Sequence, residues 1–141
     1  MKEYAGKVRL VYKDLPLRRH PLARSAHEAA RCAGAVGRYW AYHDRLYANQ
    51  PAFDRARLLQ YSVEIGLDPA AFARCLVRRE FAREVDEDIE LAIDLGIHAT
   101  PTFVVVPGKL RFPLSGPRLV GAHPIENFRA AIDDALKALR K

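Results

Sequence analysis

The stretch GIHATPTFVVV, residues 96–106, constrains the fold of this chain more than any other. Gly96 follows a helical pattern and ends it, because glycine readily takes the left-handed conformation that closes a helix. A Thr-Pro-Thr turn comes next, and the apolar, mostly β-branched run from Phe103 to Val106 favours a strand. The chain therefore changes from helix to strand across a short turn that contains a proline.

The rest of the sequence predicts a strand, several helices, two strands and a last helix. Residues 7–15 (KVRLVYKDL) predict a buried strand that Pro16 ends. Glycines, prolines and the capping residues Asp54 and Asp68 then bound a series of helices, which we expect over residues 21–35, 38–50, 53–66, 67–79 and 80–96. Strands over residues 102–106 and 116–122 flank a loop from Pro107 to Pro117, and a helix over 123–141 ends the chain. This order predicts an α/β domain with a helical insertion.

Composition narrows the function classes. The length of 141 residues suits one domain, and no apolar run approaches the roughly 18 residues of a membrane span. The net charge is +6, but the arginines are scattered, so we do not expect a nucleic-acid partner. The start MKEYAGKVRL lacks the apolar region of a signal peptide. As written, the chain is expected in the cytoplasm, or in the periplasm or another extracytoplasmic space if its natural start lies upstream.

Four segments resemble the DsbA branch of the thioredoxin superfamily. They are VRLVYKDLPL with HPLARSAHEAARCA, GRYWAYHDRLYANQ, DLGIHATPTFVV and LVGAHPIENFRAAID, and together they cover nearly the whole chain. The resemblance implies one thioredoxin-like domain over residues 1–141. Residues 1–16 and 97–141 would form its thioredoxin part, and residues 17–96 its DsbA-type helical insertion.

The resemblance also shows what these residues lack. Members of the family normally begin with a strand and a Cys-x-x-Cys at the start of a helix, and Met1 stands where that helix ends. We therefore expect a fold without the first central strand and most of the first helix, which leaves backbone groups unpaired in the middle of a sheet. The flanking strands could pair directly, a second chain could lend a strand in a homodimer, or the protein begins further upstream.

The two cysteines, Cys32 and Cys75, are 43 residues apart and form no Cys-x-x-Cys. Cys32 lies late in a helix, the wrong end for lowering the pKa of a thiol through the helix dipole. Relatives in the DsbA branch often carry a structural disulfide at these positions, and the resemblance implies one here. The alternative is two free, buried cysteines that act as small apolar residues.

The resemblance implies a cis peptide bond before Pro101 and a substrate-binding role for Thr100 and Pro101. In the family, the backbone at this position pairs with an extended peptide. The alternative is an inherited turn without a ligand. His98, His43 and Asp44 lack the Cys/His spacing of a zinc site, so we expect no metal and no other cofactor.

The leading expectation is a DsbA-like protein thiol–disulfide oxidoreductase domain that is redox-inactive as given, because catalysis requires the absent cysteine pair. Its substrates would be cysteine-containing polypeptides. The second expectation is a non-catalytic module that binds an extended peptide or dimerises through the cis-proline loop or an open sheet edge. A glutathione-using enzyme of the superfamily has little support, since its catalytic device would also lie in the absent region.

Overall fold

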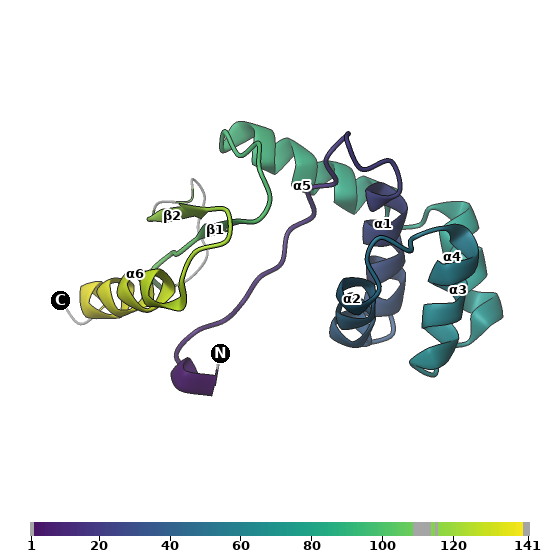
Figure 1. The fold of residues 1–141 in the computed structure, drawn as a ribbon, viewed down its shortest axis with the longest axis horizontal. Helices are drawn as coiled ribbons and strands as arrows, with labels where there is room; N and C mark the ends of the chain where they lie inside the picture. The colour runs from purple at the N-terminus through teal and green to yellow at the C-terminus, as the bar shows by residue number, and fades with distance from the viewer. Residues whose placement is uncertain (1, 109–113, 115, 140–141) are drawn as a thin grey trace. The chain divides into compact units, whose positions relative to one another are not determined.

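The computed structural model describes residues 2–108, 114 and 116–139, and the chain is mostly helical with a small two-stranded sheet. It divides into two compact units, Met1–Glu90 and Leu91–Lys141. Figure 1 shows the elements in chain order, which are η1 (Lys2–Tyr4), α1 (Ala23–Gly34), α2 (Tyr39–Ala48), α3 (Arg55–Glu64), α4 (Pro69–Arg78), α5 (Ala82–Asp94), β1 (Thr102–Val104), β2 (Arg118–Val120) and α6 (Ile125–Ala138). The helices predicted between residues 21 and 96 therefore form, and α5 crosses the boundary between the units.

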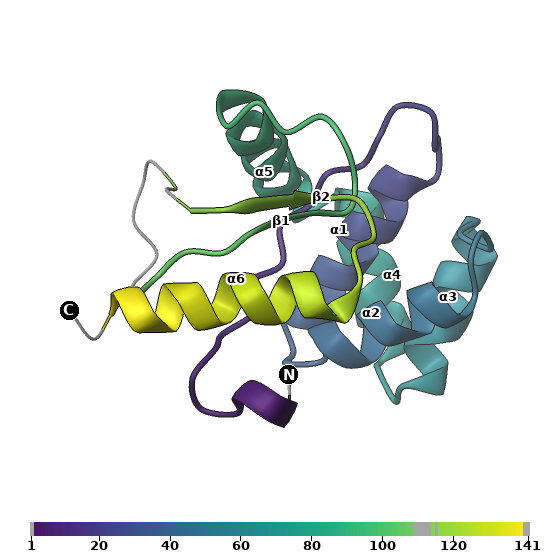
Figure 2. The ribbon, with the colours of Figure 1, turned by 60° about the vertical axis from the view of Figure 1, so that its left-hand side comes forward.

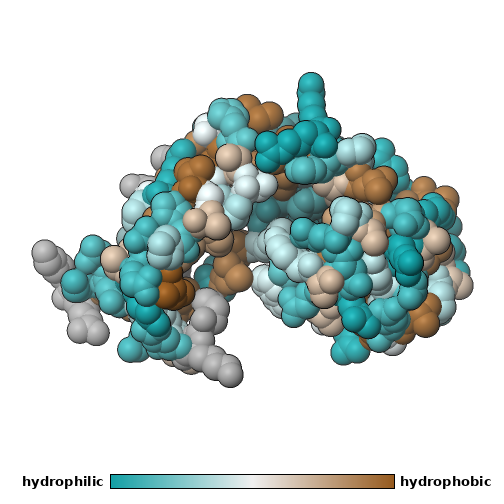
Figure 3. Space-filling view, viewed as in Figure 1, coloured by the Kyte–Doolittle hydropathy of each residue, from teal (hydrophilic) through white to brown (hydrophobic). Residues whose placement is uncertain are grey.

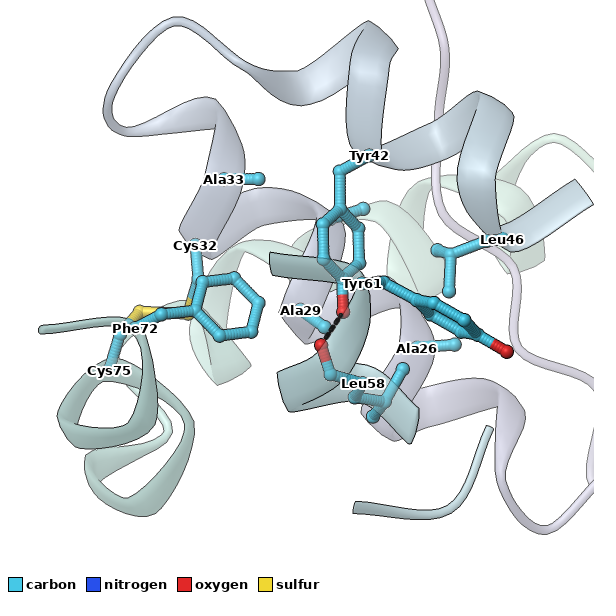
Figure 4. Packing of buried hydrophobic residues seen from close by; sticks show 11 residues of the cluster. Ala26, Ala29, Cys32, Ala33, Tyr42, Leu46, Leu58, Tyr61, Phe72 and Cys75 are labelled. Carbon is cyan, nitrogen blue, oxygen red and sulfur yellow. Dashed lines mark hydrogen bonds between the residues drawn. A yellow bond between two sulfur atoms is a disulfide. The ribbon is translucent and has the colours of Figure 1, made fainter. Parts of the chain in front are cut away.

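The first unit is built around α1, which packs against α2, α3 and α4. Its inward face consists of small side chains, so the neighbouring helices can approach closely. Larger side chains from those helices, Tyr42, Leu58, Tyr61 and Phe72, fill the space (Figure 4). Tyr42 is fully buried and its hydroxyl donates a hydrogen bond to the carbonyl oxygen of Leu58 at 2.7 Å. A buried hydroxyl needs such a partner, and here it also joins α2 to α3.

Both predicted aspartate caps are confirmed. The Asp54 carboxylate accepts a hydrogen bond from the backbone N–H of Arg57 at 3.1 Å, at the start of α3. Asp68 accepts from the N–H groups of Ala70 and Ala71, and these bonds lower its pKa below the ordinary value. Each cap satisfies donors that the first turn of a helix leaves without an intrahelical acceptor.

The predicted strand over residues 7–15 is wrong. Residues 8–17 have no regular secondary structure, and Leu10 and Val11 are exposed rather than buried. Val, Leu and Tyr favour a strand only when another strand supplies hydrogen bonds, and no described strand pairs with this segment. Among the described residues, this segment is therefore not a strand of the sheet.

The second unit holds the sheet and the last helix. Strands β1 and β2 are antiparallel, with Phe103 opposite Leu119. The Phe103 ring meets that of Phe128 on α6 edge to face at 4.9 Å, so α6 covers the face of the sheet that carries Phe103 (Figure 2). Both strands are shorter than predicted, and six residues of the predicted 107–117 loop, namely 109–113 and 115, lie outside the described part of the chain.

In the space-filling view, hydrophilic and hydrophobic residues are interspersed over the helical unit (Figure 3). Within the described residues, no helix is both long and apolar enough to cross a membrane. Larger apolar side chains that remain exposed include Leu10, Val11, Trp40 and Tyr47.

Candidate functional site

The Thr100–Pro101 turn connects α5 to β1. Gly96 ends α5 with φ +63°, and the N–H of Ile97 reaches back to the carbonyl oxygen of Ala92 at 2.8 Å, an arrangement that closes a helix end. The Thr100–Pro101 peptide bond is cis, and both residues are exposed. The turn is therefore accessible to a ligand.

Hydrogen bonds within the turn fix where β1 begins. The Thr102 hydroxyl donates to the carbonyl oxygen of Ala99 at 2.7 Å, across the cis bond. The N–H of Gly121 donates to the carbonyl oxygen of Pro101 at 2.7 Å, which ties the proline to the end of β2. Pro101 lies directly before β1, and its carbonyl group faces β2.

The same register leaves one edge of β1 open. Pro101 and Val105 direct their backbone groups to β2, since the N–H of Val105 donates to the carbonyl oxygen of Pro117 at 3.0 Å. Alternate residues of a strand direct these groups to opposite edges, so Thr102 and Val104 present theirs to the other side. No described strand pairs with that edge. An extended peptide could add there as a third strand.

Cys32 of α1 and Cys75 of α4 form a disulfide (Figure 4). Their Cα atoms are 6.1 Å apart, and the two residues are only 6 % and 8 % exposed. They are the chain's two cysteines, so no thiol is free to attack a substrate disulfide. The bond lies in the helical unit, whereas Thr100 and Pro101 belong to the second unit.

A buried ionic network, which the sequence reasoning missed, holds the segment before α1. Asp14 and Asp88 are 1 % and 3 % exposed. The Asp14 carboxylate contacts His27 Nδ1 at 2.7 Å and accepts from Arg31 Nε at 2.5 Å. Asp88 accepts from the N–H of Asp14 at 2.9 Å, from Lys13 Nζ at 2.5 Å and from Arg31. The spacing of His27 and Arg31, one turn apart beside the alanine face of α1, was the available signal.

Burial alone would raise the pKa of Asp14. The hydrogen bonds and charges of His27 and Arg31 outweigh that effect and hold the pKa below its ordinary value. Asp14 is therefore an ionised, paired carboxylate, not a proton donor poised near neutral pH. We assign this network a structural role.

Glu28 forms a second charged cluster on α1. Its carboxylate accepts from Arg24 Nε at 2.9 Å and from Arg79 Nη2 at 2.7 Å. Burial would raise the pKa of Glu28, but Arg79 and Arg24 lower it overall. Glu28 and Arg79 also line a cavity of about 270 Å³, together with Leu22, Ser25, Phe53, Arg55, Leu58 and Leu76.

An aromatic cluster joins the segment before α1 to α2. Tyr12 contacts Trp40 and His43 edge to face, with ring centroids 6.4 and 5.1 Å apart, and its hydroxyl lies 3.3 Å from that of Tyr47. Tyr39 packs against Trp40 at 5.3 Å. Burial, followed by the Tyr47 hydrogen bond, raises the pKa of Tyr12 well above its ordinary value, so its hydroxyl is neutral.

The histidines weighed as metal ligands are not brought together. His43 packs within the aromatic cluster and contacts the exposed carboxylate of Asp44 at 3.0 Å. His98 is exposed in the loop before Thr100. Among the described residues, no three His, Cys, Asp or Glu side chains come close enough to hold a metal ion.

Comparison with known proteins gives one family and several long relatives. The family profile described as Thioredoxin matches residues 1–134. The chain is 36 % identical over 134 residues to "Na(+)/H(+) antiporter NhaA 1" of Salinispora arenicola, over 94 % of this chain and 19 % of that protein. It is 35 % identical over 134 residues to "Na(+)/H(+) antiporter NhaA 3" of Salinispora tropica, with the same coverage. A third relative, "Na(+)/H(+) antiporter NhaA" of Herminiimonas arsenicoxydans, is 33 % identical over 77 % of this chain and 17 % of its own length.

The chain thus spans about a fifth of the length of these relatives. No solved structure matches it. The family match covers nearly all residues, including both cysteines and the cis-proline turn. The chain therefore belongs to the thioredoxin family.

Proposed function

We propose that these residues form the client-binding part of a DsbA-like protein thiol–disulfide oxidoreductase domain and do not themselves exchange disulfides. The observation that carries this proposal is that Cys32 and Cys75 are bonded to each other, while Thr100–Pro101 remains exposed beside an open strand edge. Exchange requires a thiolate that attacks a disulfide sulfur and a second thiol that resolves the mixed disulfide. The clients would be cysteine-containing polypeptides.

Insulin reduction by dithiothreitol tests the absence of exchange. The purified chain should not accelerate the precipitation of insulin B chains above the rate with dithiothreitol alone. The variant Cys32→Ser/Cys75→Ser controls for a contribution from the pair after reduction. Turnover by the double variant would show that our account of the chemistry is wrong, and turnover by the wild type alone would make Cys32–Cys75 a redox centre.

A non-catalytic peptide-binding role is the second candidate, and the open edge of β1 favours it. The N–H of Val104 faces this edge, so Val104→Pro removes a donor for an added strand without removing a β1–β2 hydrogen bond. Val120→Pro is the matched control, because Gly121 faces β1 and the Val120 N–H therefore faces the outer edge of β2.

Fluorescence anisotropy with labelled, extended cysteine-containing peptides measures the binding. We expect Val104→Pro to weaken it at least fivefold and Val120→Pro to leave it within twofold. Equal losses in both variants would show that the β1 edge is not the binding site. Light scattering in the same experiment separates peptide binding from a homodimer formed through this edge.

We propose as well that this domain acts beside an NhaA-type antiporter. Two relatives that match 94 % of the chain at 35–36 % identity carry the antiporter name, and the matched part is 19 % of their length. An antibody against residues 1–141 would test the association in cells of the source organism. Detection of a polypeptide far above 15.9 kDa in the membrane fraction supports it, and a 15.9 kDa soluble species contradicts it.

A further inference from the structure

The cavity of about 270 Å³ in the helical unit lies where α1, α3 and α4 meet. Its lining residues recur at spacings of three along each helix, so those of one helix lie on the same face. They are Leu22, Ser25 and Glu28 at the start and along α1, Arg55 and Leu58 in α3, Leu76 and Arg79 at the end of α4, and Phe53 before α3. The Thr100–Pro101 turn belongs to the second unit, so this cavity is not part of it.

The inner wall of the cavity is apolar. Leu58 is only 2 % exposed, and Phe53 and Leu76 are half-buried against the hydrophobic core. An apolar cavity of about 150 Å³ in a protein can hold benzene. The larger volume found here has room for one ring with a short chain.

Glu28 and Arg79 form a fixed pair on the wall. The Glu28 carboxylate accepts from Arg79 Nε at 3.2 Å and Nη2 at 2.7 Å, and from Arg24 Nε at 2.9 Å. Arg79 closes α4 with φ +51°, in the left-handed region that glycine usually occupies at a helix end. Backbone strain of this kind is concentrated at binding sites. The two arginines neutralise Glu28, so its charge does not exclude an anion from the cavity.

Arg55 supplies a free positive charge at the mouth of the cavity. It is exposed, and its side chain makes no hydrogen bond or ion pair with any described residue. The exposed Ser25 hydroxyl likewise has no partner among the described residues. Asp54 precedes Arg55 in the chain, but it does not line the cavity, and its carboxylate accepts from the backbone N–H of Arg57. The cavity thus joins an apolar wall to one uncompensated cation.

These features select the chemical class of a ligand. An apolar wall with one free guanidinium complements an apolar molecule that carries a single carboxylate. A peptide fits less well, because its amide groups need hydrogen-bond partners, and among the described lining residues Ser25 offers the one uncharged polar side chain. We propose that this cavity binds a small apolar carboxylic acid. Its hydrocarbon part packs against Leu58, and its carboxylate pairs with Arg55.

The probe 4-phenylbutyrate tests the proposal, with 4-phenylbutyramide as its uncharged analogue of nearly the same shape. Titration of the oxidised, ¹⁵N-labelled chain is followed by two-dimensional NMR. We expect a dissociation constant of about 1 mM or lower for the acid, as is usual for a ligand of this size. The amide should bind at least fivefold more weakly. The shifted backbone signals should be those around Ser25, Arg55 and Leu76.

Three variants separate the charge from the cavity. Arg55→Gln should weaken binding of the acid at least fivefold and leave binding of the amide within twofold. Arg57→Gln is the matched control, because it removes the same charge from α3 at an exposed position outside the cavity, and it should change binding of the acid less than twofold. Ser25→Phe fills the mouth and should weaken both ligands at least tenfold. All these positions are exposed, so the variants should keep the circular dichroism spectrum of the wild type.

Four results would overturn the proposal. They are equal affinity for the acid and the amide, equal losses in Arg55→Gln and Arg57→Gln, shifts that map to the Thr100–Pro101 turn, and no binding at about 10 mM acid. Tighter binding of the peptide acetyl-Gly-Gly-Phe than of 4-phenylbutyrate would also contradict it, because the cavity would then be a peptide site. The insulin assay does not depend on this cavity, so the redox proposal stands or falls separately.

Discussion

The His27 ring and the Asp14 carboxylate are joined at 2.7 Å, Nδ1 to Oδ1, although Asp14 is only 1 % exposed. Arg31 holds the second carboxylate oxygen of Asp14 at 2.5 Å. Asp14 belongs to the stretch without regular secondary structure before α1. A segment that gains no strand pairing is thus fixed by buried charges instead.

Asp14→Asn should lower the free energy of unfolding by about 3 kcal/mol. The neutral amide removes one of the two buried carboxylates that pair with Arg31 and leaves it with Asp88 alone. Breaking a buried pair from one side usually costs 3–5 kcal/mol. Urea unfolding followed by circular dichroism measures the change. Asp44→Asn is the control, because Asp44 also contacts a histidine but is 80 % exposed at its side chain, and we expect an effect within about 0.5 kcal/mol. Similar effects in both variants would contradict a role for burial.

The stability that Asp14 contributes should disappear in acid. Its pKa is lower in the folded chain than the ordinary value of 3.8, so the unfolded chain binds more protons as the pH falls and acid favours unfolding. Glu28, whose pKa is also lowered, acts in the same direction. The contribution is complete above about pH 5 and is lost as the pH falls through the folded-state pKa.

Urea unfolding at pH 7, 5, 4 and 3 checks this dependence. The difference between the wild type and Asp14→Asn should stay constant from pH 7 to 5 and shrink at pH 4 and 3. A difference that grows in acid would mean that Asp14 is destabilising when ionised, contrary to the network described above.

Reduction of the Cys32–Cys75 disulfide should lower the free energy of unfolding by about 4 kcal/mol, the value that the chain-entropy model gives for a separation of 43 residues. Urea unfolding compares the oxidised wild type with the reduced wild type in dithiothreitol and with Cys32→Ser/Cys75→Ser. The reduced wild type and the double variant should have the same free energy of unfolding, and it should be lower than that of the oxidised wild type. If the oxidised chain reacts with Ellman's reagent before unfolding, the disulfide is not formed and the stability difference has another cause.

Local signals predicted the helical unit well. Asp54 and Asp68 cap α3 and α4 as their positions indicated, because an N-cap depends on three or four adjacent residues. The cis bond at Pro101 followed from the family resemblance rather than from local propensity. These features are decided within a short stretch of sequence or by a recognised motif.

Non-local features could not be predicted from the pattern. Residues 7–15 read as a strand, but strand formation depends on a partner that no property of the segment supplies. Asp14 and Asp88 are 74 positions apart, so their convergence on Arg31 required the fold. The sequence indicated which residues could be buried and charged, but not that these would meet.

The buried hydroxyl of Tyr42 provides a last test of the helical core. Tyr42→Phe keeps the ring against Phe72 but removes the hydrogen bond to the carbonyl oxygen of Leu58, which is 2.7 Å long. The free energy of unfolding should fall by about 1–2 kcal/mol, since the buried carbonyl loses a donor that water cannot replace. Tyr47→Phe on the same helix is the control, because Tyr47 is 57 % exposed. Removal of its hydroxyl should change the free energy of unfolding by less than about 0.5 kcal/mol. Thermal unfolding of both variants decides the matter: an unchanged melting temperature for Tyr42→Phe would mean that the ring alone, and not its hydroxyl, joins α2 to α3.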